Sequence, residues 1–280
     1  MTLNDRIRDF YDQSTGIWLD TWGEHMHHGH YGDDGKAVKG NEEAQIDLIE
    51  ALLDYGGVTA AARILDSGCG VGGSSRYLAQ KFDAEALGFT LSPVQAAAAA
   101  AYNRAAGLDD RVTIKAQNVY TLPDDTPSFD LVWSLESAEH MADKQGLFEL
   151  FYRHLQPGGK LLMITWCTRE VPPALMGQDH RLLQKIYDYY HLPPMVPVSA
   201  LRDMAARAGF GGIQTDDWSE AVAPFWGKVI RSAMSWKSMR GLLKAGPGTL
   251  RGAWAMRYMQ AGYRRGLIRF GVLAAEKPLG

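Results

Sequence analysis

The sequence has few cysteines and no long apolar run. Cys69 and Cys167 are the only cysteines among 280 residues, which offers no disulfide framework and no thiolate metal site and favours a reducing compartment. No stretch approaches the roughly 18 apolar residues of a membrane span. The charged start MTLNDRIRDFYDQ has no apolar signal-peptide segment. We therefore expect a cytoplasmic protein that is not integral to a membrane.

Acidic residues are missing from 228–270. This stretch contains ten Lys and Arg residues and no Asp or Glu, so the rest of the chain, whose total net charge is −3, carries −13. Apolar side chains recur there at spacings compatible with amphipathic helices, namely Trp236, Met239, Leu242, Leu243, Trp254, Met256, Tyr258 and Met259. One interpretation is a solvated basic face. The other predicts peripheral membrane contact through 228–270, because anionic lipids attract basic residues.

Short β-branched runs alternate with longer helical patterns from about residue 58 onward. Strands are expected near 62–66, 85–90, 111–116, 129–134, 160–166, 212–218 and 267–276, and helices near 74–82, 94–106, 143–155 and 199–208. This alternation is typical of βαβ units. It predicts an α/β, Rossmann-like fold, with a mostly parallel seven-stranded sheet and helices on both faces.

The chain is expected to form a single domain over 1–280, because no linker or internal repeat divides it. Its expected regions are an N-terminal helical cap (1–57), a cofactor-binding core (58–167), and substrate-side insertions with the C-terminal strands (168–280). In the last region, the Pro-, Met- and Tyr-rich stretch 168–200 suits a lid or substrate-binding insertion, and helices are expected across 222–265.

The run ILDSGCGVGGSSR at 64–76 places a glycine-rich turn between a strand and a helix. Gly68, Gly70 and Gly73 satisfy G-x-G-x-x-G, which is typical of a dinucleotide site, whereas Gly72 as the third glycine gives the spacing of an S-adenosylmethionine site. Asp66 disfavours a pyrophosphate beside the loop. A dinucleotide fold usually has an acidic residue at the end of its second strand, where this chain has Thr90.

Several further motifs resemble the class I S-adenosylmethionine-dependent methyltransferases: LDSGCGVGG, GFTLSPVQ, AQNV, SFDLVWSLESAEHM and LQPGGKLLMITW. The resemblance is closer still to the γ-tocopherol methyltransferases, through FYDQSTGIWLDTWGEHMHHGHYG (10–32), DWSEAVAPFW (217–226) and GLIRFGVLAAEKP. It covers essentially the whole chain. It implies the class I methyltransferase fold and S-adenosylmethionine as cofactor. The sequence departs from the family at Ser67, where a larger apolar residue is usual, and at Asn118, where many members have Asp.

The resemblance also implies a set of cofactor contacts. Gly68, Gly70 and Gly72 would approach the methionine part and the ribose, and Asp66 would anchor the loop. Thr90 and Gln95 would meet the ribose hydroxyls, Leu91 would cover the adenine, and Asn118 would bind the adenine amine. Ser134 would sit beside the methionine end, and Tyr11 would close over the cofactor. Cys69 and Val119 complete this predicted set.

The acceptor side needs a base if the acceptor is a phenol, because an ortho ring carbon becomes nucleophilic when the phenol loses its proton. Glu139 and His140 are the first candidates, since they follow the fourth strand at the carboxyl edge of the sheet. The alternative is a helix-start carboxylate with a structural histidine. His30 and Tyr31, in HMHHGHY, are the next candidates. That histidine-rich segment suggests a metal site, but no cysteine or carboxylate cluster accompanies it, and we predict none.

Methylation of the aromatic ring carbon of a prenylated phenol, of the γ- to α-tocopherol type, is therefore the leading functional prediction, with a small hydrophobic phenolic substrate as partner. An N- or O-methyltransferase of a small aromatic or indole alkaloid is the alternative. A cofactor-binding protein without catalysis is a more distant one, and Thr90 disfavours an NAD-dependent reductase. We expect no nucleic-acid partner. The sequence leaves the tail preference and the oligomeric state open.

Overall fold

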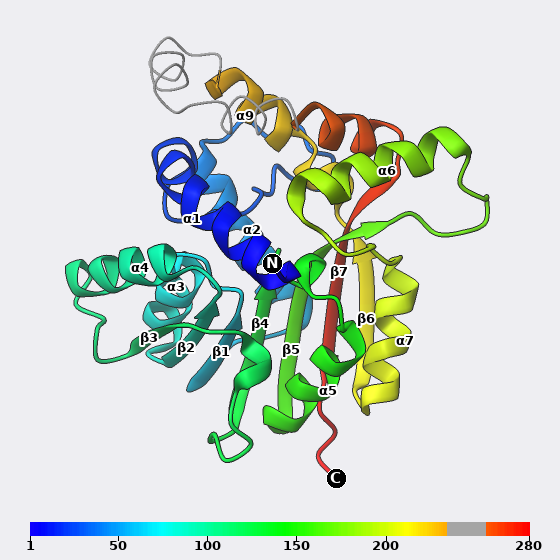
Figure 1. Ribbon diagram of the computed structural model, residues 1–280. Helices are drawn as coiled ribbons and strands as arrows, with labels where there is room; N and C mark the ends of the chain where they lie inside the picture. The colour runs from blue at the N-terminus through cyan, green and yellow to red at the C-terminus, as the bar shows by residue number, and fades with distance from the viewer. Residues whose placement is uncertain (234–255) are drawn as a thin grey trace.

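A single twisted sheet forms the centre of the computed structural model, which describes residues 1–233 and 256–280 (Figure 1). Its order is β3-β2-β1-β4-β5-β7-β6, and β7 runs antiparallel to both of its neighbours. The strands are β1 (Arg63–Ser67), β2 (Glu85–Thr90), β3 (Val112–Ala116), β4 (Phe129–Leu135), β5 (Leu155–Thr168), β6 (Gly211–Asp217) and β7 (Ile268–Glu276). The predicted mostly parallel, seven-stranded α/β sheet is confirmed.

Helices cover both faces of this sheet (Figure 1). They are α1 (Leu3–Trp22), α2 (Asn41–Gly56), α3 (Gly73–Phe82), α4 (Pro93–Ala105), α5 (Lys144–His154), α6 (Gly177–Tyr190), α7 (Val198–Ala208), α8 (Ser219–Val222), α9 (Pro224–Ala233) and a helix at 256–264. Two short 3-10 turns, η1 (Val119–Thr121) and η2 (Ala138–His140), follow β3 and β4. No helix among these described residues is long and apolar enough to cross a bilayer.

The core consists of two apolar layers, one on each face of the sheet. Successive strand residues point to opposite faces, so Ile64 belongs to one layer and Leu65 to the other. Both side chains are fully buried, as expected for a parallel sheet covered on both sides. Leu48 of α2 packs in the first layer, and Phe148 of α5 packs in the second. The sheet is therefore a fixed platform from which the loops at its carboxyl edge project.

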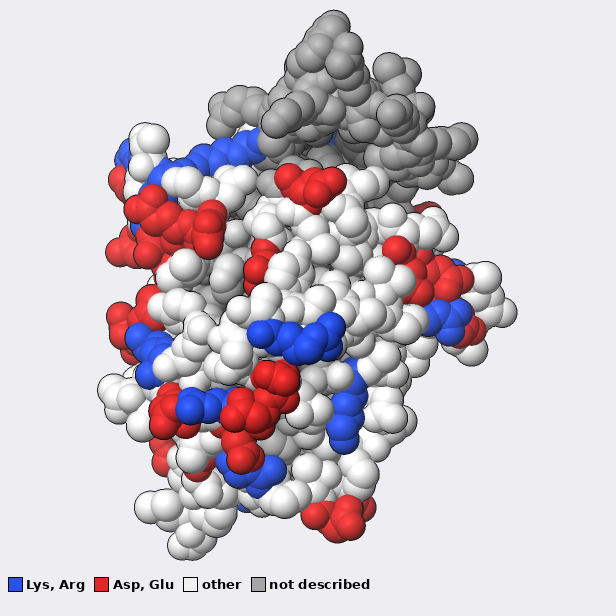
Figure 2. Space-filling model, turned by 90° about the vertical axis from the view of Figure 1, so that its left-hand side faces the viewer, with Lys and Arg blue, Asp and Glu red and all other residues white. Residues whose placement is uncertain are grey.

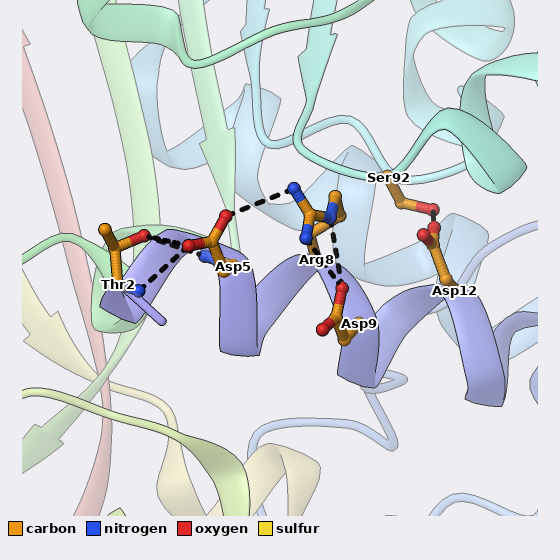
Figure 3. A network of polar contacts seen from close by, with 6 residues as sticks. All are labelled: Thr2, Asp5, Arg8, Asp9, Asp12 and Ser92. Carbon is orange, nitrogen blue, oxygen red and sulfur yellow. Dashed lines mark hydrogen bonds and ion pairs between the residues drawn. The ribbon is translucent and has the colours of Figure 1, made fainter.

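Helix α1 lies over that carboxyl edge (Figure 1). Its first turn is closed by a capping box, in which Thr2 and Asp5 exchange hydrogen bonds. Arg8 continues this polar network along the helix, and further on Asp12 accepts a hydrogen bond from the hydroxyl of Ser92 (Figure 3). Ser92 also caps α4 by accepting from the amide of Gln95 at 3.0 Å. The N-terminal helix is thus held to the loop between β2 and α4.

The structure differs from the sequence prediction at the start of one strand. Strand β5 begins at Leu155 and not near residue 160, because Leu155 pairs with Phe129 before the register shifts across the QPGGK turn. The stretch 168–200, predicted as a lid or insertion, contains the 14-residue helix α6. Its buried Leu183 and Ile186 are three residues apart, which places both on the face that packs against the protein.

Candidate active site

The glycine loop connects β1 to α3 and holds its glycines in left-handed backbone conformations. The φ angles of Gly68, Gly70 and Gly72 are 82°, 56° and 77°, values that side chains other than glycine adopt at a cost. A Cβ on Gly68 would collide with Ser137, so that position is closed by packing. A Cβ on Gly70 would meet only the sulfur of Met26, at 3.9 Å. Gly70 therefore borders open space.

That space is a cavity of about 120 Å³. It is lined from α1, from the segment after α1, and from the loops that follow β1, β2 and β4. Its lining includes Ile7, Tyr11, Glu24, His25, Met26, His27, Asp66, Gly68, Cys69, Gly70, Thr90, Leu91, Gln95, Glu136, Ser137, His140 and Met141. Ligands of open α/β sheets bind at this carboxyl edge.

Asp66 is a carboxylate at the inner end of the cavity. It is only 2% exposed, and the hydroxyl of Ser75 donates a hydrogen bond to its Oδ2 at 2.6 Å. Burial raises the pKa of Asp66 to about 7, although the Ser75 hydrogen bond acts to lower it. A cationic group in the cavity would favour the ionised carboxylate. The site therefore suits a ligand that carries an ammonium group beside the glycine loop.

Polar side chains at the end of β2 and the start of α4 also line the cavity. The hydroxyl of Thr90 donates to Gln95 Oε1 at 2.7 Å, and it accepts from the Ser92 amide at 3.2 Å. Thr90 and Gln95 are buried, and Leu91 lines the cavity beside them. The structure therefore brings these three predicted residues together.

Four predicted cofactor residues do not reach the cavity lining, namely Gly72, Asn118, Val119 and Ser134. Asn118 accepts a hydrogen bond from the Tyr120 amide at 3.1 Å and so caps η1, while Val119 is buried in the apolar layer that contains Phe148. Ser134 is fully buried, 3.0 Å from the hydroxyl of Ser137, which does line the cavity. Ser134 therefore meets the site only through Ser137.

The pair Glu139 and His140 is divided between two environments. His140 lines the cavity, where its Nε2 lies 2.8 Å from the Tyr11 hydroxyl. Burial lowers the pKa of His140 to about 3. Glu139 is 1% exposed and turns to the sheet, where Thr165 Oγ1 donates to its Oε2 at 2.7 Å. Consecutive residues of the tight turn η2 point in different directions, so the sequence neighbours do not form a joint site.

Burial also raises the pKa of Glu139 to about 8, and the nearby charge of Glu136 adds to this effect. His30 and Tyr31 lie outside the cavity lining as well. His30 packs edge-on against Trp218, and the Lys228 ammonium lies 4.3 Å from the ring centroid of Tyr31. No three metal-ligating side chains converge within the part of the chain that the structure describes.

A carboxylate–imidazole pair that the sequence analysis did not single out lies beside the cavity, with Glu136 in the lining and His28 outside it. Glu136 lines the cavity and follows directly after β4. It accepts hydrogen bonds from the main-chain amide of His28 at 2.6 Å, from His28 Nδ1 at 2.7 Å and from Trp166 Nε1 at 3.2 Å. Burial would raise the pKa of Glu136, but the charge and hydrogen bonds of His28 outweigh it and hold the pKa below its usual value.

Aromatic rings surround His28. The Phe225 ring is nearest, with its centroid 4.0 Å from that of the imidazole, and the next rings lie at 5.1 to 6.2 Å, namely Phe270, Trp226, Tyr263 and Trp166. These residues come from β5, α9, the helix at 256–264 and β7. His28 belongs to the sequence motif HMHHGHY, and Glu136 belongs to WSLES. The contact between them is visible only in the folded structure.

Comparisons with known proteins agree with this geometry. Residues 64–159 match the methyltransferase domain family. The chain is 42% identical, over 99% of its length and 79% of the relative, to a probable tocopherol O-methyltransferase, chloroplastic, of Oryza sativa subsp. japonica. It is 39% identical, over 99% of its length and 83% of the relative, to tocopherol O-methyltransferase, chloroplastic, of Arabidopsis thaliana. The chain belongs to the tocopherol methyltransferase family of class I S-adenosylmethionine-dependent methyltransferases.

Two more distant proteins extend the comparison of this tocopherol methyltransferase family member. The 2-methyl-6-phytyl-1,4-hydroquinone methyltransferase of Synechocystis sp. (strain ATCC 27184 / PCC 6803 / Kazusa) is 30% identical, over 98% of this chain and 88% of the relative. The solved structure of geranyl diphosphate C-methyltransferase from Streptomyces coelicolor A3(2) superposes with a TM-score of 0.77 over 99% of this chain and 98% of that one. At 20% identity, that likeness concerns the fold alone.

Proposed function

We propose that this protein methylates the aromatic ring carbon of a prenylated phenol, as in the conversion of γ- to α-tocopherol. The observation that carries the proposal is the full-length identity of 42% and 39% to two tocopherol O-methyltransferases. It is supported by the likeness to a methyltransferase of a phytylated hydroquinone. Those relatives share a substrate class, a phenol with an isoprenoid tail. Transfer to the phenolic oxygen is the competing outcome.

The cofactor side of the proposal rests on the cavity beside the glycine loop. S-adenosylmethionine, when bound, supplies a methyl group attached to a positively charged sulfur. Asp66 would hold the ammonium group of the methionine part, and Gly70 would leave room for the ligand. Thr90 and Gln95 would bind the ribose, and Leu91 would cover the adenine. Asn118 and Val119 would lie on the adenine side of the cofactor, and Ser134 would act on the site through its hydrogen bond with Ser137.

The acceptor side rests on the aromatic residues around His28. Phe225, Trp226 and Phe270 are flat and apolar, so they suit the ring system of a tocopherol. Most of the rate of a methyl transfer can come from holding the nucleophilic carbon in line with the departing sulfur in a dry site. This aromatic wall would exclude water and orient the ring.

We further propose peripheral contact with membranes, from which a lipid-tailed acceptor would be collected. Of the ten basic residues in 228–270, Lys237, Arg240, Lys244 and Arg251 lie outside the described residues. Arg265 forms an ion pair with Asp179, and Arg269 lies 3.4 Å from Asp217. These two arginines are therefore partly engaged by acidic side chains of the same protein. Arg264 is exposed. Each basic residue near an anionic leaflet contributes about 1 kcal/mol.

Sedimentation with anionic vesicles tests the membrane proposal. We expect pelleting that falls as salt rises and weakens severalfold in Arg264→Glu, because that change removes one charge and adds its opposite. Arg104→Glu is the matched control, since Arg104 is exposed on α4, outside the basic stretch. No pelleting at low salt, or equal weakening in both variants, would contradict a specific docking surface.

A panel of acceptors tests the function itself. Purified protein is incubated with methyl-labelled S-adenosylmethionine and with tocopherols, tocotrienols and indole alkaloids in turn. We expect the highest kcat/KM with a prenylated phenol that has a free ortho position. A preference for the alkaloids would instead make the protein an N- or O-methyltransferase. Cofactor binding without transfer to any acceptor would leave a non-catalytic binding protein.

A further inference from the structure

The hydrogen bonds of the Glu136–His28 pair determine which nitrogen of the imidazole carries a proton. An ionised carboxylate can only accept hydrogen bonds. Because Glu136 Oε2 lies 2.7 Å from His28 Nδ1, the proton is assigned to Nδ1. The other nitrogen, Nε2, is buried and has no hydrogen-bond partner among the described residues. Such orphaned polar atoms are rare in folded proteins and call for a ligand or a water molecule.

A second orphaned group lies beside the imidazole. The hydroxyl of Tyr263 is also buried without a partner among the described residues, and its ring centroid is 6.1 Å from that of His28. The two side chains come from distant parts of the sequence, and aromatic rings surround the imidazole. Two unpartnered polar groups between apolar rings suit an aromatic ligand that carries a hydroxyl group.

The backbone of Glu136 is itself unusual. Glu136 has a φ of 51°, and the other non-glycine residues with positive φ in the described ranges, Asp83 and His191, are C-caps of helices. Glu136 caps no helix, and its amide is fixed to Ile164 O at 2.8 Å. A non-glycine residue keeps this conformation only when its surroundings enforce it, and such residues cluster at functional sites. Here the conformation lets one carboxylate both face the cavity and bind His28.

We propose that His28 and Glu136 form an acid–base dyad for the acceptor, in which His28 Nε2 takes the proton of the phenolic hydroxyl and Glu136 positions the imidazole. This inference rests on the proposed function and assigns residues to it. Glu136 is a positioning residue, since it acts through the imidazole and stabilises the imidazolium that forms. Tyr263 offers its hydroxyl as a donor to the same oxygen.

The proton balance of the step closes as follows. The phenolic O–H bond breaks, Nε2 gains the proton, and the electron pair left on oxygen makes the ortho ring carbon nucleophilic. That carbon takes the methyl group, and the electron pair of the broken C–S bond stays on sulfur. The ring carbon then loses its own hydrogen as a proton to solvent, while Nε2 returns its proton to oxygen. Each turnover thus releases one proton and leaves the dyad unchanged.

The neighbouring titratable groups are less suited to this role. Glu139 faces the sheet, where its carboxyl group accepts a hydrogen bond from Thr165. His140 does line the cavity, but its Nε2 is engaged by the Tyr11 hydroxyl, and burial lowers its pKa to about 3, which makes it a weak base. His140 Nδ1 is also buried without a partner among the described residues, so its lowered pKa and its contact with Tyr11 are what make His140 less suited.

Steady-state kinetics of His28→Gln test the dyad. We expect kcat to fall at least 100-fold, in line with the roughly 10²–10⁴-fold contribution of a general base, while KM for the acceptor and Kd for S-adenosylhomocysteine change less than about threefold. His154→Gln is the matched control. His154 is also a buried histidine with an unpartnered Nε2, but it ends α5 and lies outside the cluster of aromatic rings around His28. Its kcat should stay within about twofold of the wild type.

Two readouts separate proton transfer from a structural role. Acceptors made more acidic by an electron-withdrawing ring substituent should recover much of the rate in His28→Gln, because they need less help to ionise. Added imidazole should restore part of the activity of His28→Ala. If the His28 variants fail to fold, Glu136→Gln provides the test of the dyad. The kcat of this variant should fall at least tenfold, and more acidic acceptors should restore part of the lost rate.

Three outcomes would overturn the inference. One is a kcat for His28→Gln within fivefold of the wild type. Another is a loss that is equal for all acceptor acidities and is not relieved by imidazole, which would make the pair structural. The third is a wild-type enzyme that methylates none of the prenylated phenols. That result would overturn the proposed function as well, whereas the first two leave the proposed function standing.

Discussion

Gly68 and Gly70 are two positions apart in the glycine loop, and a side chain would be unfavourable at each of them for a different reason. A side chain on Gly68 would collide with Ser137, so glycine there permits the loop to pack. At Gly70, the nearest atom to an added Cβ is the Met26 sulfur at 3.9 Å, and the space beyond is the cavity. The second position therefore reports on ligand binding more than on folding.

Gly70→Val should weaken binding of S-adenosylhomocysteine at least tenfold, as measured by calorimetry, because the side chain occupies ligand space. The left-handed φ of 56° also adds strain, on the order of 1–2 kcal/mol. Gly107→Val controls for that strain: its φ is 66°, nothing lies within 4 Å of its added Cβ, and it is outside the cavity lining. Equal losses of affinity in the two variants would contradict the proposed role of the loop.

Ionisation of the buried Glu139 carboxyl group should change the stability of the folded protein with pH. Its pKa is raised by burial to about 8 from the usual 4.5. Between these values the folded protein binds a proton that the unfolded chain releases, so this contribution is fully present below about pH 4.5 and is lost as pH rises toward 8. Glutamine cannot ionise, and so Glu139→Gln does not lose stability in this window.

The free energy of unfolding of Glu139→Gln, measured relative to that of the wild type, should therefore increase from pH 5 to pH 8. The expected increase is about 1 kcal/mol or more, since one pKa unit corresponds to about 1.4 kcal/mol. Melting curves at several pH values measure it. Glu149→Gln, at an exposed position of α5, supplies the comparison. A relative stability that stays constant with pH would mean that Glu139 is ionised in the folded protein.

At the scale of elements, α1 is the helix that contributes Ile7 and Tyr11 to the cavity lining. It meets the loop regions through Tyr11 and His140, 2.8 Å apart, and through Asp12 and Ser92 (Figure 3). Tyr11 and Ile7 place one face of this helix over the cavity. Binding of the cofactor should therefore be coupled to the docking of α1.

Tyr11→Phe should weaken cofactor binding about fivefold, because one hydrogen bond that holds α1 over the cavity is lost, a contribution of about 1 kcal/mol. Hydrogen exchange should also show less protection of α1 by S-adenosylhomocysteine than in the wild type. Ser14→Ala is the control, since its hydroxyl bonds only to Phe10 O within the same helix. Unchanged affinity and protection in Tyr11→Phe would show that α1 does not close on the cofactor.

The elements were predictable wherever local pattern decides them. The alternation of strands and helices gave the sheet, since residues such as Ile64 and Leu65 serve opposite faces. The glycine loop was predictable because its spacing follows from backbone geometry. The Glu136–His28 pair was not, because its two members are 108 positions apart and meet only after folding. Glu139 and His140 are adjacent in sequence, yet η2 turns them apart.

At the scale of the whole molecule, the charge asymmetry of the sequence does not produce a single-sign surface everywhere. Figure 2 shows acidic and basic side chains interspersed on the face that carries α4 at the left of Figure 1. The described residues form local ion pairs between neighbouring charges, such as Arg8 with Asp9 at 2.9 Å and Lys81 with Glu50 at 2.8 Å. Exposed pairs of this kind contribute little stability. That face therefore offers no single-sign patch for an anionic membrane, and the membrane proposal depends on the basic stretch 228–270.

The central claim is that the methyl group reaches a ring carbon of a prenylated phenol, and one product analysis tests it most directly. Wild-type protein is incubated with γ-tocopherol and with S-adenosylmethionine that carries a ¹³C-labelled methyl group, and the product is examined by NMR. The account predicts a new labelled methyl on the ring carbon ortho to the hydroxyl, which makes the product α-tocopherol. A label found on the phenolic oxygen, or no labelled product at all, would contradict it.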